Sequence, residues 1–168
     1  LSRRANASYR IYRREVHMDT GVVSVSWREG DAVYRREVFA SRESHLVYLR
    51  YTAQGGTIDT KIWLDLHDPE TLGKTEIPDR KSGADGAYLT YAARNDSTYM
   101  PGDYGAVAKI TTDGAYICET DRISVTGATA ITLVLRVFLA TPRESGYKES
   151  MEILDAAPSY EAALSAHV

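Results

Sequence analysis

A repeated five-residue sequence near the start of the chain constrains its fold more than any other feature. YRREV at residues 12–16 returns at residues 34–38, and two turn signals lie between the copies, DTG at 19–21 and REGD at 28–31. Strand-like segments joined by short turns that contain glycine are typical of antiparallel hairpins. Residues 12–41 therefore predict a three-stranded antiparallel meander.

The rest of the chain continues in short segments that alternate apolar and polar side chains. Because side chains on a strand point alternately to its two faces, this period of two predicts half-buried strands. Together with the meander, we expect strands over residues 9–18, 22–27, 32–40, 45–53, 57–66, 87–94, 104–112, 115–120, 123–125 and 129–141. Asp113-Gly114, between two of these segments, is a strong hairpin signal.

The segment 129–141 is the longest apolar-rich strand. One face carries an apolar stripe of five residues: Ile131, Leu133, Leu135, Val137 and Leu139. Val134 and Phe138 lie on the opposite face. Strands buried on both faces have this composition, so we expect it to be central and covered on both sides.

The character of the sequence changes after residue 141. Pro142 to Gly146 reads as a break, 147–157 as a short helix, and Ser159 as the N-cap of a second helix. Eight to ten regularly spaced strands followed by helical residues predict an all-β, antiparallel two-sheet sandwich with a short helical C-terminal segment. We expect a β-sandwich domain over residues 1–141, incomplete at its N-terminus, and the start of a helical linker over 142–168.

Composition and charge exclude several classes of protein. The 168 residues carry a net charge of −3, which argues against bulk electrostatic attraction to nucleic acid or to an anionic membrane. Five arginines among the first fourteen residues favour protection of an edge strand over a phosphate-binding arm. No run of 18 apolar residues is present, so no membrane span is expected. The chain starts without methionine, which is typical of an excised or processed piece, and an extracellular or periplasmic location is favoured over a cytoplasmic one.

Motifs that carry catalytic or cofactor chemistry are missing from the sequence. None of the four histidines has the spacing of a zinc site, and no nucleophile elbow, phosphate loop or dinucleotide fingerprint occurs. We therefore assign no catalytic residue, no metal ligand and no cofactor. The single cysteine, Cys118, is expected to be a small buried core residue. Residues 67–86 predict a long polar loop.

Three residues of one strand are the only candidates for ligand contact. Asp59, Trp63 and Asp65 lie on the outward face of the segment 57–66. An aromatic face between two carboxylates is a conceivable sugar platform, because sugars stack on aromatic rings while carboxylates accept hydrogen bonds from hydroxyl groups. A solvated strand face explains the same pattern more simply.

Several motifs together resemble a known family. YRREVxxDTGxxxVS at residues 12–26 and YxREVFAS at 34–41 resemble the N-terminal β-domain of glycoside hydrolase family 95, the bacterial inverting α-L-fucosidases. The apolar segment 127–141 and the sequence SYEAALSAH at 159–167 are similar to later parts of that domain and its linker. The resemblance is strong at 12–41, moderate at the two later segments and weak through both long loops.

The resemblance implies a non-catalytic domain of a larger enzyme. Family members have a β-supersandwich, a helical linker and an (α/α)6 catalytic barrel, so the partner would be the remainder of the same chain and the substrate a fucosylated oligosaccharide. The catalytic residues belong to the barrel, so the chain by itself is expected to be inactive. Two alternatives remain: an autonomous carbohydrate-binding sandwich that uses Trp63 and tyrosines, and a surface or adhesin sandwich unrelated to hydrolysis.

Overall fold

The computed structural model describes residues 10–65, 79–95, 98 and 101–168, which form eleven strands and two helices. The strands are β1 (Arg10–His17), β2 (Val22–Glu29), β3 (Ala32–Ala40), β4 (Val47–Gln54), β5 (Ile58–Ile62), β6 (Lys81–Asp85), β7 (Tyr88–Asn95), β8 (Gly102–Thr112), β9 (Ala115–Cys118), β10 (Ile123–Ala128) and β11 (Ala130–Thr141). The helices are α1 (Arg143–Asp155) and α2 (Tyr160–His167).

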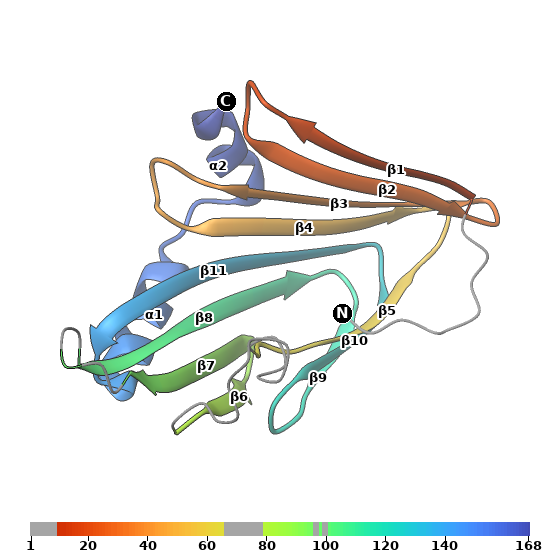
Figure 1. Ribbon diagram of the computed structural model, residues 1–168. Helices are drawn as coiled ribbons and strands as arrows, with labels where there is room; N and C mark the ends of the chain where they lie inside the picture. Colours follow the sequence, from red (N-terminus) through yellow and green to blue (C-terminus); the bar gives the residue numbers. More distant parts are fainter. Residues whose placement is uncertain (1–9, 66–78, 96–97, 99–100) are drawn as a thin grey trace.

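The strands form two antiparallel sheets, which confirms the predicted fold class. The large sheet has the order β1-β2-β3-β4-β11-β8-β7-β6, and the small sheet has the order β5-β10-β9. Figure 1 shows the large sheet running from β1 at the top to β6 at the bottom, with the helices at the left. The predicted meander is confirmed, because Val23 of β2 pairs with Val16 of β1 on one side and with Val38 of β3 on the other.

Two hydrophobic clusters lie on opposite faces of the large sheet. On β4, Tyr48 belongs to the cluster that contains helix residues such as Leu154, whereas Tyr51 belongs to the cluster that contains Ile58 and Ile123 of the small sheet. Residues three apart on a strand point to opposite faces. The helices therefore cover one face of the large sheet and the small sheet covers part of the other.

The Asp113-Gly114 dipeptide is a corner between the two sheets, and the predicted hairpin at this position is wrong. β8 before it pairs with β11 in the large sheet, while β9 after it pairs with β10 in the small one. The Asp113 carboxylate accepts hydrogen bonds from the backbone N–H groups of Thr129 and Ala130, both at 2.9 Å. A Cβ on Gly114 would lie 2.6 Å from the carbonyl oxygen of Thr126, so glycine is needed for this close approach.

The predicted polar loop 67–86 is corrected in its last part, where Lys81–Asp85 forms β6 and pairs with β7. The two strands are joined by Gly86 and Ala87, and Gly86 has a φ of +56°, a conformation that two-residue hairpin turns favour. The Asp85-Gly86 dipeptide therefore marks a hairpin turn between β6 and β7. Residues 66–78 of that loop lie outside the described residues.

β11 is central in the large sheet, as predicted, but its cover is incomplete. Ile131 is 1% exposed on one face and Phe138 is 9% exposed on the other. Val137 and Leu139, at the far end of the apolar stripe, are 67% and 55% exposed. The small sheet is too narrow to reach this end of the strand, so the expected burial of the whole stripe is wrong there.

Helix α1 starts four residues earlier than expected, because Pro142 and Gly146 do not break it. Pro142 occupies the N-cap, just ahead of the first helical turn where its missing N–H costs nothing. Gly146 is inside the helix because it faces an aromatic ring of the sheet: a Cβ there would lie 2.6 Å from Cδ2 of Phe138. The glycine lets α1 approach the sheet closely, so packing outweighs its low helix propensity.

Cys118 and the N-terminal arginines lie on edge strands. Cys118 is exposed, which corrects the prediction of a buried core residue: β9 is the outer strand of the small sheet and all four of its residues are exposed. β1 is the outer strand of the large sheet, so Arg13 and Arg14 lie on the edge that the charge pattern predicted. Arg3 and Arg4 lie outside the described residues.

Ser159 caps helix α2, as the sequence predicted, by accepting a hydrogen bond from the backbone N–H of Ala162 at 3.2 Å. We expect Ser159→Ala to lower the free energy of unfolding by about 1 kcal/mol, because the N–H loses its acceptor. Chemical denaturation measures this loss. Ser159→Asp should keep nearly all of the stability, since aspartate caps equally well; equal losses in both variants would show that the cap contributes nothing.

Candidate functional site

The three ligand-contact candidates lie on and just after β5. The Asp59 carboxylate accepts a hydrogen bond from the backbone N–H of Gly127 at 2.7 Å, so it fixes the backbone of β10 at that residue. Trp63 is 39% exposed. Asp65 forms an ion pair with Arg80 at 3.4 Å. Asp59 and Asp65 thus have structural partners, while Trp63 is partly exposed.

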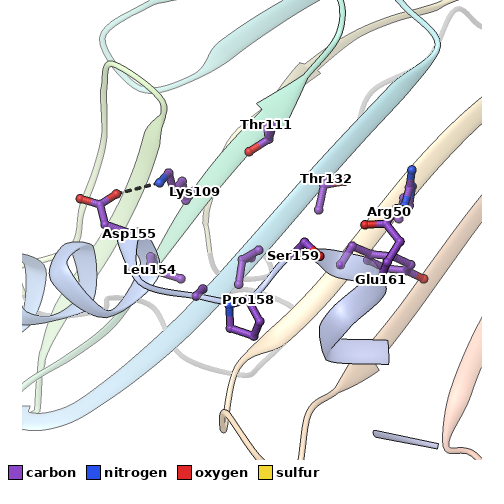
Figure 2. Close-up of a pocket in the computed structure, with 12 residues that line it drawn as sticks. Arg50, Lys109, Thr111, Thr132, Leu154, Asp155, Pro158, Ser159 and Glu161 are labelled. Carbon is purple, nitrogen blue, oxygen red and sulfur yellow. Dashed lines mark hydrogen bonds and ion pairs between the residues drawn. The ribbon is translucent and has the colours of Figure 1, made fainter. Parts of the chain in front are cut away.

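A pocket of about 280 Å³ lies on the opposite side of the molecule, between the helices and the large sheet. We call it the helix–sheet pocket. Its floor comes from β4, β11 and β8, and its walls from the end of α1, the connector 156–159 and the start of α2 (Figure 2). The residues that line it are Arg50, Lys109, Thr111, Thr132, Val134, Leu154, Asp155, Ala157, Pro158, Ser159, Tyr160 and Glu161. It contains none of the three candidates on β5.

Two ion pairs stand at opposite ends of the pocket, because β4 and β8 flank β11 in the sheet. Lys109 on β8 donates to Asp155 at the end of α1 at 2.7 Å, and Arg50 on β4 donates to Glu161 in the first turn of α2. Residues 50 and 161 are 111 positions apart in sequence. Both contacts join a helix end to the sheet, and together they hold the helices over the floor of the pocket.

The carboxylates of these pairs are ionised at neutral pH. Hydrogen bonds from Lys109 and then from Tyr88 lower the pKa of Asp155, and a hydrogen bond from Arg50 lowers the pKa of Glu161. Burial, followed by the bond to Asp155, raises the pKa of Tyr88 to about 12, so its hydroxyl stays protonated and donates. Each positive charge therefore faces a negative one, and the pocket is close to electrically neutral.

This arrangement does not provide acid–base or metal chemistry. A general acid or base needs a pKa near the working pH, whereas the perturbed carboxylates here are shifted away from it. Within the described residues, no group of three or more histidine, cysteine, aspartate or glutamate side chains is placed to hold a metal ion. None of the helices described is long and apolar enough to span a membrane. The pocket can hold a small polar ligand.

A buried ion pair fixes the start of α1 at the other end of the helix. The Arg143 side chain is 8% exposed and donates from Nε to Asp103 at 3.2 Å and from Nη2 to Asp79 at 2.8 Å. The Asp103 carboxylate also accepts from the backbone N–H of Arg143 at 3.1 Å, so it caps the helix that it pairs with. These contacts join β8, α1 and the segment that leads into β6.

Five aliphatic side chains form a row across five neighbouring strands on the face that carries the small sheet. This apolar row follows from strand register and consists of Val16, Val23, Val38, Leu49 and Leu133. Val16 is 57% exposed and the other four are half-buried. Val137 and Leu139 extend the same surface along β11.

Sequence reasoning missed the pocket because its members come from five separate elements. Only the start of α2, with its Ser159 cap and Glu161, could be read from local pattern. Arg50 and Lys109 look like ordinary exposed charges on alternating strands, and no spacing rule connects them to their partners. The strand register that aligns Thr132 with both Arg50 and Thr111 is a property of the folded sheet alone.

Comparisons with known proteins identify relatives of the chain. Residues 2–142 match a family model described as "Glycosyl hydrolase family 65, N-terminal domain". Among curated proteins, no significant match was found. A solved structure described as "Putative kojibiose phosphorylase from human microbiome" matches with a TM-score of 0.65 and 13% identity, over 96% of this chain and 24% of that chain. At this identity the likeness shows the fold.

These findings confirm the coarser part of the sequence resemblance, namely an N-terminal domain of a glycoside hydrolase family. They point to family 65 and give no support to family 95 in particular. The chain spans about a quarter of the length of the solved structure that it resembles.

Proposed function

The chain belongs to the family of N-terminal domains of glycosyl hydrolase family 65, and we propose that it is the non-catalytic part of a larger enzyme, packed against a helical catalytic domain. In this proposal residues 142–168 begin the linker to that domain. The chain stiffens one wall of the substrate cleft and excludes water from it, while the reacting groups come from elsewhere in the enzyme.

The observation that carries this proposal is the partly exposed apolar surface of the large sheet, in which Val16, Val137 and Leu139 are exposed. The apolar row, extended by Val137 and Leu139, places aliphatic side chains side by side across much of one sheet face. Monomeric soluble proteins rarely leave large contiguous apolar surfaces in water, and such surfaces mark contact sites. The helices cover the other face of the sheet, so the part of this face that the small sheet does not reach is the one that needs a cover.

A substitution at the end of the apolar row distinguishes two effects: loss of packing against a partner domain and loss of stability in the 168-residue chain. We expect Val137→Lys to change the stability of the 168-residue chain by less than about 0.5 kcal/mol, because Val137 is 67% exposed. In the full enzyme the same change should expose the domain to limited proteolysis and lower its melting temperature, because a buried lysine lacks a partner.

Ile117→Lys is the matched control, since Ile117 is 69% exposed on the outer strand of the small sheet, away from the row. It should leave the full enzyme unchanged. Equal and small effects of Val137→Lys in the chain and in the full enzyme would refute packing through this surface.

The reaction of the full enzyme has two candidates, each with its own support. The name of the solved relative favours phosphorolysis of a disaccharide such as kojibiose, with inorganic phosphate as acceptor. The motifs at residues 12–41 favour hydrolytic release of L-fucose, as in the family 95 fucosidases. Assays of the full enzyme with kojibiose, with and without phosphate, and with a fucosylated oligosaccharide distinguish them. The 168-residue chain alone should release no sugar; turnover by the pure chain would refute a non-catalytic role.

A second candidate function is sugar binding at Trp63, favoured by the exposure of this aromatic residue. Indole fluorescence during titration with a fucosylated oligosaccharide tests it. A change in emission that Trp63→Ala abolishes supports binding there, and a flat titration removes this candidate.

A further inference from the structure

We propose that the helix–sheet pocket binds one neutral sugar ring, held by the two ion pairs at its ends and by threonine hydroxyl groups on its floor. This inference goes beyond the proposed function, because it assigns a ligand site to the domain itself, away from any catalytic centre. It rests on the charge balance, the hydrogen-bonding groups, the shape and the size of the pocket.

The charge balance favours a neutral ligand. Arg50 faces Glu161 and Lys109 faces Asp155, so an anion would have to displace a carboxylate from each cation that it contacts. A cationic ligand would have to displace Arg50 or Lys109 from each carboxylate that it contacts. A ligand without net charge leaves both pairs intact and still gains hydrogen bonds to charged groups, which are stronger than bonds between neutral groups.

The hydrogen-bonding groups match hydroxyls. Lys109 and Tyr88 both donate to Oδ1 of Asp155, which leaves Oδ2 without a partner among the described residues. Arg50 donates to Oε1 of Glu161, and the backbone N–H of Glu161 also donates to this carboxylate, which is 68% exposed and can accept further hydrogen bonds. Two acceptors at opposite ends of a pocket suit a molecule with O–H groups around its rim.

The floor supplies both polar and apolar contacts. Thr132 on β11 pairs in register with Thr111 on β8, so two threonine side chains lie side by side in the sheet. Val134, Leu154 and Pro158 line the neighbouring part of the pocket. A pyranose has this combination, with C–H groups on its faces and hydroxyls at its edge.

The size sets the length of the ligand. Pockets for drug-sized ligands start at roughly 300 Å³, so a pocket of about 280 Å³ has room for a single ring. The ion pairs stand on strands that flank β11, about 10 Å apart given the usual spacing of strands. Each pair stands at one end of the space between, so a ring in the pocket can contact the floor and the carboxylate of the end against which it lies.

The test is an NMR titration of the ¹⁵N-labelled 168-residue chain with D-glucose, L-fucose and inorganic phosphate as separate probes. We expect saturable amide shifts with at least one sugar at residues 109–111, 132–134 and 154–161, with a dissociation constant of about 1–10 mM, as suits a small and open site. Phosphate should produce no saturable shifts there.

Three variants give the titration its controls. Thr132→Val removes a floor hydroxyl at nearly constant shape, and Glu161→Gln removes one charge, so each should weaken sugar binding about three- to tenfold. Thr126→Val changes an exposed threonine of the small sheet and should leave binding unchanged. A dispersed amide spectrum establishes that each variant is folded.

The proposal would be overturned if neither sugar gave a saturable shift up to about 0.1 M, a concentration about ten to a hundred times the expected dissociation constant. Shifts centred on Trp63 instead of the pocket, or tighter binding of phosphate than of sugar, would also overturn it. So would equal affinities in Thr132→Val and Thr126→Val. None of these outcomes bears on whether the apolar row packs against a catalytic domain, so the two proposals fail independently.

Discussion

Replacing Arg143 with alanine is expected to lower the free energy of unfolding by about 3 kcal/mol at pH 7, near the lower end of the range for breaking a buried ion pair. The variant leaves the carboxylate of Asp103, whose side chain is 12% exposed, without its main partner. Asp79 is 41% exposed and recovers part of its loss by hydration, which keeps the figure at the lower end. Urea denaturation of both proteins measures the difference.

The pH dependence of this difference identifies its cause. Hydrogen bonding to Arg143 holds the pKa of Asp103 below its ordinary value. A lowered pKa contributes stability that is present above the unfolded-state value, about 4, and is lost as the pH falls through the folded-state value. The gap between wild type and Arg143→Ala should therefore be full at neutral pH and narrow below about pH 4.

Arg94→Ala is the matched control, since Arg94 is 58% exposed and lies 4.0 Å from the same carboxylate. It should cost less than about 1 kcal/mol, as exposed pairs do. A gap for Arg143→Ala that stays constant between pH 7 and pH 3 would refute the charge-based account and leave packing as the cause.

Alanine at Gly105 should cost about 3 kcal/mol or more, because it forces a methyl group into two neighbours at once. A Cβ at this position would lie 2.1 Å from the backbone oxygen of Tyr91 and 2.6 Å from Cζ of Phe138. Gly105 pairs in register with Phe138, so the ring lies across the glycine on the helix-covered face. Overpacking a core usually costs 1–3 kcal/mol, and a backbone obstacle moves this site to the upper end.

Gly146 on helix α1 contacts the same Phe138 ring, but the effect of alanine at Gly146 on stability should depend on that ring alone. The three nearest atoms to a Cβ on Gly146 all belong to the Phe138 ring, so Gly146→Ala alone should be destabilising. In a Phe138→Leu background it should become neutral or stabilising by up to about 1 kcal/mol, because alanine is the better helix former. Gly105→Ala should stay destabilising in that background, since the oxygen of Tyr91 remains.

A double-mutant cycle by thermal or urea unfolding makes this comparison. Gly83→Ala serves as a control on the outer strand β6, where a Cβ would approach only the hydroxyl of Thr90, at 3.0 Å. If Phe138→Leu removed the stability loss of Gly105→Ala and of Gly146→Ala equally, the contact with the Tyr91 oxygen would not contribute to the cost at Gly105.

The sequence predicts the local elements well because they follow from local causes. Alternation placed the strands within a few residues, and the repeat at 12–41 identified the meander. Pro142 and Gly146 misled the prediction of α1, because a glycine opposite an aromatic ring is explained by packing that no local rule contains. Cys118 misled for a similar reason: an apolar run does not reveal whether its strand is central or at an edge.

The candidate site was less predictable than the fold. The helix–sheet pocket depends on the order β4-β11-β8 and on how α1 and α2 seat on those strands, and both are non-local. Asp113-Gly114 shows the same limit within a strong motif. The dipeptide marks a sharp change of direction correctly, yet whether the chain folds back within one sheet or crosses to another is decided by Gly114 packing against the chain near Thr126.

That corner means that β8 with β9, and β10 with β11, are the two arms of one long ribbon that bends from the large sheet into the small one. The layers of the sandwich are therefore continuous through covalent backbone as well as in contact through side chains. The two arms are joined by a short turn near residues 119–122. Strand pairing between the arms can therefore begin at this turn, with a small loss of loop entropy, before the outer strands of the sheet pair. The hydrogen bonds of Asp113 to Thr129 and Ala130 lie at the bend where the two ladders meet. We therefore expect the two sheets to unfold as one cooperative unit, with slow amide exchange extending around the bend.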